Sequence, residues 1–252
     1  MAYNTGEDSS SREGSVPKRD GMPVEFARPD LDREQRKGVP EVLLAQGKRH
    51  EDVLAIARQF VNRTGRAIIS RVDEQLVPKL QSDFDDCDLS EHQPSGMVVI
   101  KRHGYWLRPT GGKVGVVTAG TSDVPVAEEA RIIASEMGCD VHAVYDVGVA
   151  GIHRLFEPLR TLVEDLGVDV LVVAAGMDGA LPSVVAGLVD VPVIGLPTSV
   201  GYGLGGNGIA ALMSMLQTCS PGLTVVNIDN GVGAGATAAL IANRMARVRA
   251  AV

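Results

Sequence analysis

The chain has 252 residues, of which 45% are hydrophobic, so it is long enough for one large domain or two modest ones with a substantial core. Its formal net charge of −7 argues against a surface that binds nucleic acid or a membrane. Cys87, Cys139 and Cys219 form neither a disulfide framework nor a zinc motif, and the sequence shows no leader or long apolar run, so we expect a cytoplasmic protein.

The first part of the chain predicts a small mixed α+β domain over residues 30–111, preceded by a disordered arm. Residues 1–29 are polar and rich in Ser, Gly, Pro and charged residues, a composition typical of disorder. The expected elements after the arm are helices at 31–38, 51–62 and 73–80, a strand at 67–70, an acidic loop at 82–91, and a hairpin of 97–101 with 105–108. Residues 109–112 then form the predicted linker.

From residue 112 to residue 252 strands and helices alternate, which predicts a larger α/β domain. The expected strands lie near 113–119, 140–146, 169–175, 192–196 and 223–227, and the expected helices lie near 125–138, 152–166, 180–189, 207–217 and 234–248. This alternation indicates right-handed crossovers and a doubly wound parallel sheet of the flavodoxin-like type.

Polar loops follow the first four of these strands, at 120–123, 146–154, 174–182 and 197–208. Because parallel strands end at the same edge of a sheet, we expect the loops to converge on one crevice. The plainer alternative for the first loop is an ordinary turn in which Ser122 and Asp123 only cap the next helix. Gly201, Gly203 and Gly206 have the GxGxxG spacing, but a dinucleotide fingerprint belongs after the first strand. We therefore favour backbone amides that face an anion over a merely flexible loop.

Three side chains of this domain are candidates for chemistry, and each has a structural alternative. Asp178 is the sole carboxylate of its loop and serves either as a base or as a helix cap. His153 is a lone histidine, which is more often structural than catalytic. Cys219 is either a thiol buried at a turn or a nucleophile. It follows a helix rather than a strand, so it should lie at the opposite edge of its own sheet, and a catalytic role requires a second subunit.

Basic residues are unevenly distributed along the chain. Residues 112–252 contain only 7 of the 24 Lys and Arg residues. An anionic ligand must therefore find much of its positive charge in the first domain or in another subunit. Arg36, Lys37 and Lys48 are our candidates for these phosphate or carboxylate contacts.

Several segments resemble known families. AGTSDVPVAEEA, AGIHR, PVIGLPT, the glycine loop and GATAALIA resemble, in order, the segments of the PurE family of aminoimidazole ribonucleotide carboxylases and mutases. Two departures matter, because Ala180 stands where that family usually carries a histidine, and Cys219 has no PurE counterpart. RKGVPEV, AGMDGALPSVVAG and TCSPGLTVVNIDNG instead resemble the LarB family.

The LarB resemblance implies a pyridinium-3,5-biscarboxylic acid mononucleotide synthase in nickel-pincer nucleotide cofactor biosynthesis. Its substrates would be nicotinic acid adenine dinucleotide and CO2, its second product AMP, its cofactor Mg2+, and its assembly a homo-octamer. The metal ligands stay open, with Asp123 and Asp146 as possibilities. The substrate-binding residues would be Gly120, Thr121, Ser122, Asp123, His153, Arg154, Gly176, Met177, Gly203, Gly205, Gly206 and Asn207. Family members often carry Glu at the position of Asp178, so here the acid is one methylene shorter.

The chemistry of this reaction needs one nucleophile and one base. A pyridinium ring is too electron-poor to attack CO2, whereas addition of a thiolate to carbon 4 makes carbon 5 nucleophilic. Cys219 would supply the thiolate, and Asp178 would remove the proton from carbon 5 after carboxylation. The alternatives are a PurE-type carboxylase or mutase, whose substrate needs no cysteine, and a nucleotide-binding module without catalytic activity.

Overall fold

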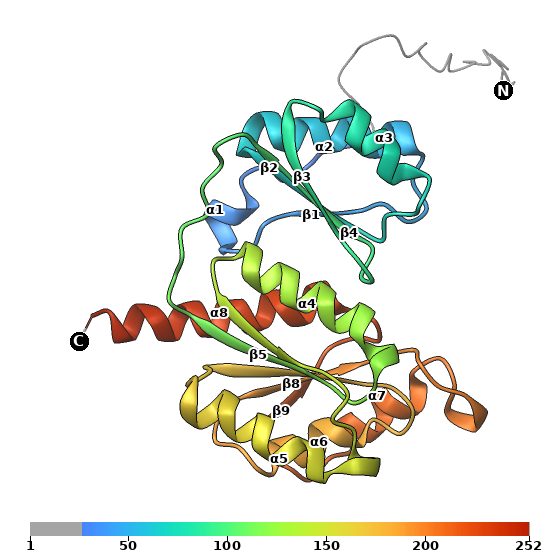
Figure 1. The fold of residues 1–252 in the computed structure, drawn as a ribbon, viewed down its shortest axis with the longest axis vertical. Coiled ribbons are helices and arrows are strands. Elements are labelled where there is room, and N and C mark those ends of the chain that lie inside the picture. The colour runs from blue at the N-terminus through green and yellow to red at the C-terminus, as the bar shows by residue number, and fades with distance from the viewer. Residues whose placement is uncertain (1–26, 252) are drawn as a thin grey trace, which may run out of the picture.

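The computed structural model describes residues 27–251, which form two sheets joined by the segment 103–112 (Figure 1). The predicted arm at 1–29 lies outside the described residues up to residue 26. Within residues 27–251 no helix is long and apolar enough to cross a membrane.

The first sheet is mixed, with the strand order β1-β2-β4-β3. Its elements are α1 (Arg33–Lys37), β1 (Val42–Leu44), α2 (His50–Thr64), β2 (Arg66–Ser70), α3 (Leu76–Asp83), β3 (Cys87–His92) and β4 (Met97–Arg102). Strands β1 and β2 are parallel, and β4 is antiparallel to both of its neighbours.

Two expectations for this region are wrong. The segment predicted as an acidic loop at 82–91 contains β3, and the partners of β4 are β2 and β3 rather than residues 105–108. Strand β3 lies at the sheet edge, where Cys87 and Leu89 pack inward while Asp88 and Ser90 are exposed. Charged side chains are common on edge strands because they discourage pairing with other chains. The acidic residues of the segment 82–91 therefore concealed the alternation of inward and exposed side chains in β3.

The second sheet has five parallel strands in the order β6-β5-β7-β8-β9, which is the predicted flavodoxin-like order. Its strands are β5 (Lys113–Thr118), β6 (Asp140–Val144), β7 (Val170–Ala175), β8 (Val193–Pro197) and β9 (Leu223–Val225). Its helices are α4 (Val124–Glu136), α5 (His153–Arg160), which continues as a π-helical turn at Thr161–Asp165, α6 (Ala180–Ala186), α7 (Ile209–Leu216) and α8 (Gly231–Arg249). Short 3-10 turns lie at Thr121–Asp123, Val149–Gly151 and Gly203–Gly205.

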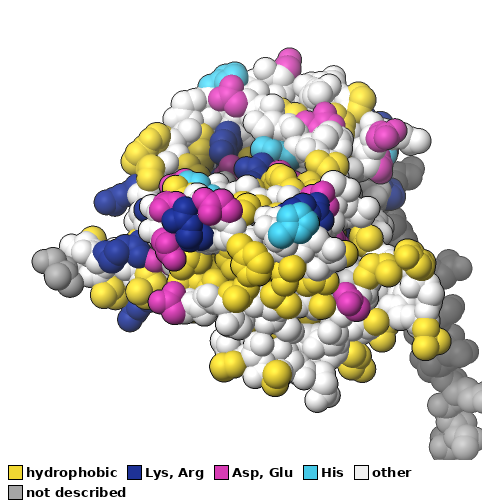
Figure 2. Space-filling model, turned by 60° about the horizontal axis from the view of Figure 1, so that its bottom comes forward, with side chains coloured by type: hydrophobic (Ala, Val, Ile, Leu, Met, Phe, Trp, Pro, Cys, Tyr) yellow, Lys and Arg dark blue, Asp and Glu magenta, His cyan; other side chains and the backbone are white. Residues whose placement is uncertain are grey.

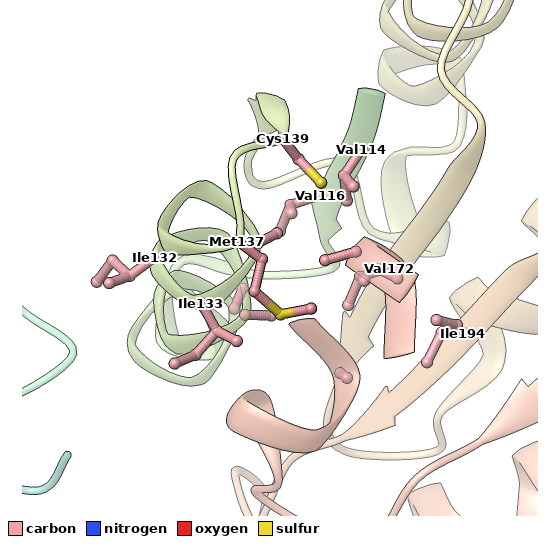
Figure 3. Packing of buried hydrophobic residues seen from close by; sticks show 14 of the residues in the cluster. Val114, Val116, Ile132, Ile133, Met137, Cys139, Val172 and Ile194 are labelled. Carbon is pink, nitrogen blue, oxygen red and sulfur yellow. The ribbon is translucent and has the colours of Figure 1, made fainter. Parts of the chain in front are cut away.

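Helices α4 and α8 lie between the two sheets, and α5, α6 and α7 cover the far face of the five-stranded sheet (Figure 1). The two central helices approach closely, since a Cβ atom at Gly235 of α8 would lie 2.3 Å from the carbonyl oxygen of Ala130 in α4. Ile133 and Met137 from the α4 side pack with Val116 of β5 (Figure 3). Small residues on α8 therefore let both helices share one buried layer.

The two sheets also share a core and a buried ion-pair network. Ile68, Met97 and other side chains of the first sheet belong to the same hydrophobic cluster as the inward face of α4. Beside them Arg66, only 3% exposed, contacts Glu136 at 3.0 Å and Glu34 at 2.6 Å, and Lys101 contacts Glu136 at 2.7 Å. Burial of paired charges requires a defined geometry, so this network helps to fix how the first sheet sits on α4.

Candidate functional site

The carboxyl edge of the five-stranded sheet brings the predicted polar loops together. They lie at 120–123 after β5, 145–152 after β6, 176–179 after β7 and 198–208 after β8. Hydrogen bonds join neighbouring loops to each other and to the strands. Met177 N donates to Val200 O at 2.9 Å, and Thr198 N donates to Ala175 O at 3.1 Å. The loops therefore line one continuous edge, as a parallel sheet requires.

Asp123 is the buried centre of this edge. One carboxylate oxygen accepts a hydrogen bond from the Thr198 hydroxyl at 2.6 Å, and the other accepts one from Gly120 N at 2.8 Å. Burial raises the pKa of Asp123, and the hydrogen bonds that it accepts oppose that rise. The side chain thus joins two loops rather than capping α4, while Thr121 and Ser122 are exposed beside it.

Gly176 is the point where the third and fourth loops touch. A Cβ atom there would lie 2.2 Å from Val200 O and 2.7 Å from the Thr198 hydroxyl oxygen, so only glycine fits without displacing backbone. Met177 follows in the left-handed region with a φ of 52°, and its side chain is exposed. The backbone of this loop therefore turns sharply and presents residues 177 and 178 to solvent.

Asp178 lies at this exposed turn, directly before Gly179, the N-cap of α6. One carboxylate oxygen accepts a hydrogen bond from Ala180 N at 3.4 Å, which is long for a hydrogen bond. The carboxylate is therefore only weakly tied to the first turn of α6, and the exposed side chain remains accessible to a ligand.

The second loop carries an exposed ion pair. Arg154 contacts Asp146 at 2.8 Å, and Asp146 N donates to the Thr118 hydroxyl oxygen at 3.1 Å. Asp146 has a φ of 60°, so the turn directs its carboxylate toward Arg154. His153 is exposed at the start of α5. An anionic ligand at this edge would meet the Arg154 guanidinium, which is already held in place by Asp146.

The fourth loop is glycine-rich and exposed. Gly203 has a φ of 78° and Asn207 a φ of 59°, and Gly205 and Gly206 lie between them. The loop follows Thr198, so its backbone amides begin directly beside buried Asp123. This arrangement suits contacts between backbone amides and an anion.

Cys219 lies at the other edge of the sheet. It sits between α7 and β9, and its neighbour Ser220 lies against Gly187, just beyond the C-terminal end of α6. Asp178 precedes the other end of the same helix. The seven residues of α6 at ~1.5 Å each place its two ends about 10 Å apart, so one subunit does not bring Cys219 and Asp178 together.

The three cysteines differ in accessibility. Cys139 is buried near Val114 (Figure 3), and burial raises the pKa of its thiol to about 11. Cys87 is partly buried, and burial together with the Asp86 carboxylate raises its pKa as well. Cys219 is the exposed one. A nucleophile must be reachable by its substrate, so Cys219 is the best candidate of the three.

The three basic residues predicted in the first domain fall in two separate places. Arg36 and Lys37 line a groove of about 480 Å3 beside the last turns of α8, and Arg36 pairs with Asp30 at 2.5 Å. This end of α8 lies at the amino edge, since the helix begins after β9 and runs back along the sheet. Lys48 lies in the turn after β1 and donates to Leu44 O at 2.8 Å. The structure does not bring these three cations to one site.

Sequence reasoning missed a group where the first domain meets the carboxyl edge. Arg71, Glu129 and Asp229 line a cleft of about 190 Å3 there. Burial raises the pKa of Glu129 to about 7, Asp229 adds to the rise, and Arg71 opposes it. The only signal in the sequence was an acidic pair in the first turns of a helix, which the helix dipole explains equally well.

The two aspartates named as possible metal ligands do not form a metal cage. Among residues 27–251 no three His, Cys, Asp or Glu side chains converge on a common point. Asp123 has both carboxylate oxygens in hydrogen bonds, and Asp146 is paired with Arg154.

Comparisons with known proteins identify several that are similar to this chain. An uncharacterized protein of Methanocaldococcus jannaschii is 44% identical over 219 residues, covering 86% of this chain and 84% of that protein. The N5-carboxyaminoimidazole ribonucleotide mutase of Thermotoga maritima is 33% identical over 136 residues, covering 51% of this chain and 74% of the mutase. A crystal structure of a PurE2 variant from Treponema denticola has a TM-score of 0.41 and 22% identity, covering 56% of this chain and 82% of that chain.

The family matches divide the chain at the same place as the two sheets. Residues 22–102 match the LarB/PurE-like N-terminal domain, and residues 113–251 match the AIR carboxylase family. The first match ends with β4 and the second begins with β5, so each covers one sheet. The chain therefore belongs to the LarB family, with a PurE-like C-terminal domain.

Proposed function

We propose that this carboxylase-type protein adds CO2 to the pyridinium ring of nicotinic acid adenine dinucleotide and hydrolyses its diphosphate. The products would be pyridinium-3,5-biscarboxylic acid mononucleotide and AMP. The observation that carries the proposal is the exposed thiol of Cys219 in a chain that has both a LarB/PurE-like N-terminal domain and an AIR carboxylase domain. A PurE-type substrate is already nucleophilic and would need no such thiol.

In the proposed reaction the Cys219 thiolate forms a bond to carbon 4 of the ring, and the ring electrons move onto nitrogen. The resulting dihydropyridine attacks CO2 through carbon 5, forming a new carbon–carbon bond. The Asp178 carboxylate then removes the proton from carbon 5, and the electron pair left behind expels the thiolate and restores aromaticity. No oxidant is consumed, and the cysteine is regenerated.

The diphosphate would lie along the carboxyl-edge loops. The Arg154 guanidinium and the amides of the glycine-rich loop 198–208 offer charge and hydrogen bonds to phosphate oxygens. Bound Mg2+ would neutralise the diphosphate during hydrolysis. The buried Asp123 would act indirectly, because its hydrogen bond to Thr198 holds the first and fourth loops at a fixed separation.

The proposed site requires more than one subunit, since Cys219 and Asp178 lie at opposite edges of one sheet. Helix α7, which leads to Cys219, exposes Ile209, Met213 and Leu216 on one stripe, each more than half exposed. Figure 2 turns the α5–α7 side of the molecule forward, and hydrophobic side chains are spread over its lower part with few charges. An apolar stripe of this kind supports burial against a second copy, as in the homo-octamer that the family resemblance implies.

The test is incubation with nicotinic acid adenine dinucleotide, bicarbonate and Mg2+, with AMP and carboxylated product measured by mass spectrometry. We expect Cys219→Ser to lose the product while circular dichroism shows a folded protein. Cys87→Ser is the matched control and should retain it. Carboxylated product from Cys219→Ser at the wild-type rate would refute the covalent scheme, and turnover of aminoimidazole ribonucleotide instead would assign the PurE-type reaction.

A further inference from the structure

Two non-glycine residues with a left-handed backbone meet where the first domain contacts the carboxyl edge. Arg71, directly after β2, has a φ of 54°, and Asp229, between β9 and α8, also has a φ of 54°. Aspartate tolerates this region moderately well, whereas an arginine is uncommon there and glycine is the default. Strained positions of this kind persist when their side chains are held by the surrounding structure.

The side chain of Arg71 is held at both ends of its guanidinium group. Its Nη1 donates to Oε1 of Gln46 at 2.9 Å, and its Nη2 donates to the carbonyl oxygen of Asp229 at 3.1 Å. The two bonded residues come from different domains, and positions 71 and 229 are 158 residues apart in sequence. Arg71 therefore connects the first domain to the turn that precedes α8.

The turn at Asp229 also holds the start of the glycine-rich loop 198–208. Oδ1 of Asp229 accepts a hydrogen bond from Ser199 N at 2.8 Å, and Asp229 N donates to Pro197 O at 2.9 Å. Ser199 directly follows Thr198, which is bonded to buried Asp123. A chain of hydrogen bonds thus runs from the first domain to the loop at 198–208.

We call the chain of hydrogen bonds from Arg71 through Asp229 to Ser199 the relay. The side chain of Glu129 packs against the turn at Asp229 from the side of α4. Glu129 lies against Gly231, where a Cβ atom would be 2.6 Å from Cβ of Glu129, and its carboxylate accepts a hydrogen bond from the Val232 amide. The turn at Asp229 is therefore held by Arg71 of the first domain and by the packing of the start of α8 against α4. A shift of the turn would have to break contacts on both sides.

We propose that Arg71 is a positioning residue, which holds the Asp229 turn and, through Ser199, keeps loop 198–208 in the conformation that binds phosphate. The substrate assignment rests on the proposed function, whereas the mechanical relay does not. Arg71 acts through Asp229 and does not touch the substrate. This gives the first domain a role at the carboxyl edge that its distant Arg36 and Lys37 do not supply.

The test compares Arg71→Gly, Arg71→Lys and the surface control Arg63→Ala. Glycine relieves the left-handed backbone and removes the guanidinium, so Arg71→Gly should keep or raise the melting temperature. Hydrogen exchange of the amides in 198–208 should become at least about tenfold faster in Arg71→Gly, by less in Arg71→Lys, and not at all in Arg63→Ala. KM for the dinucleotide should rise about tenfold in Arg71→Gly, while kcat stays within about threefold.

Unchanged exchange of loop 198–208 in Arg71→Gly overturns the relay. Faster exchange without turnover of the dinucleotide by the wild type upholds the relay and refutes the proposed function instead. If Arg71→Gly does not fold, Gln46→Ala tests the same relay, since it frees one side of the guanidinium without changing the backbone at residue 71. Asp229→Asn retains an acceptor for Ser199 N, so the amides of loop 198–208 should exchange hydrogen more slowly in Asp229→Asn than in Asp229→Ala. Equal exchange rates in the two variants would also overturn the relay.

Discussion

Replacement of the buried Glu129 by glutamine should make the protein more stable at alkaline pH and leave it nearly unchanged at acidic pH. Glu129 is only 6% exposed, and burial is the main reason why its pKa rises to about 7. Asp229 raises it further, while Arg71 and the Val232 amide favour the charged form. Glutamine keeps the shape and an acceptor for the Val232 amide but does not ionise.

The sign follows from proton binding in the folded and unfolded states. In unfolded chains the Glu129 carboxyl group releases its proton near pH 4.5, whereas in the folded protein it retains the proton up to about pH 7. The contribution of Glu129 to the free energy of unfolding is therefore fully present below about pH 4.5 and is lost as the pH rises through about 7. The two values differ by about 2.5 pH units at ~1.36 kcal/mol each, so the loss approaches about 3 kcal/mol. For a chain of this size that corresponds to roughly 6–12 °C in melting temperature.

Thermal unfolding of the wild type and Glu129→Gln at pH 5, 6, 7 and 8 measures this effect. The exposed Glu74→Gln removes the same charge from the surface and is the control. We expect the melting temperature of Glu129→Gln to exceed that of the wild type by an amount that grows from pH 5 to pH 8, with no such trend in Glu74→Gln. A constant difference across the pH range would show that Glu129 does not titrate in this window.

Other consequences concern the loops and the assembly. Asp178→Asn should accumulate a covalent substrate adduct detectable by intact-protein mass spectrometry, because the base is missing; normal turnover would contradict the assigned role. Gly176→Ala places a Cβ atom 2.2 Å from Val200 O, so thermal unfolding should show a loss of about 1–3 kcal/mol, and wild-type stability would mean that the loop relaxes freely. Met213→Asp should yield smaller particles by light scattering than Gln217→Asp, and an unchanged mass would exclude α7 from the subunit interface.

The larger domain was predictable because its local patterns agree with its tertiary fold. Strands β5, β7 and β8 are buried on both faces and read as continuous apolar runs, and a helix follows each one. Parallel pairing and right-handed crossovers then leave few arrangements, which is why the five-stranded sheet matched its prediction. The placement of Cys219 at the opposite edge from Asp178 followed from the same rule, since one follows a helix and the other a strand.

The smaller sheet was less predictable because its edge strand carries polar residues. In β3 only Cys87 and Leu89 pack inward, so the short alternation was concealed by neighbouring acids. The hairpin of β4 with β3 is local and was missed together with β3. The pairing of β4 with β2 joins segments remote in sequence, such as Ile68 and Val99, and leaves no local trace.

The sequence by itself determined the elements of the larger domain, the edge on which each of its loops lies and the family, because hydrophobic periodicity, turn residues and motifs are local properties. Only the tertiary structure decided which polar groups meet: Asp123 with Thr198 across 75 residues, and Arg71 with Asp229 across 158 residues. It also decided that the Asp178 carboxylate makes only a long hydrogen bond to the start of α6 and that Glu129 is desolvated. Hydrogen bonds and burial depend on distances between segments remote in sequence, and packing fixes those distances.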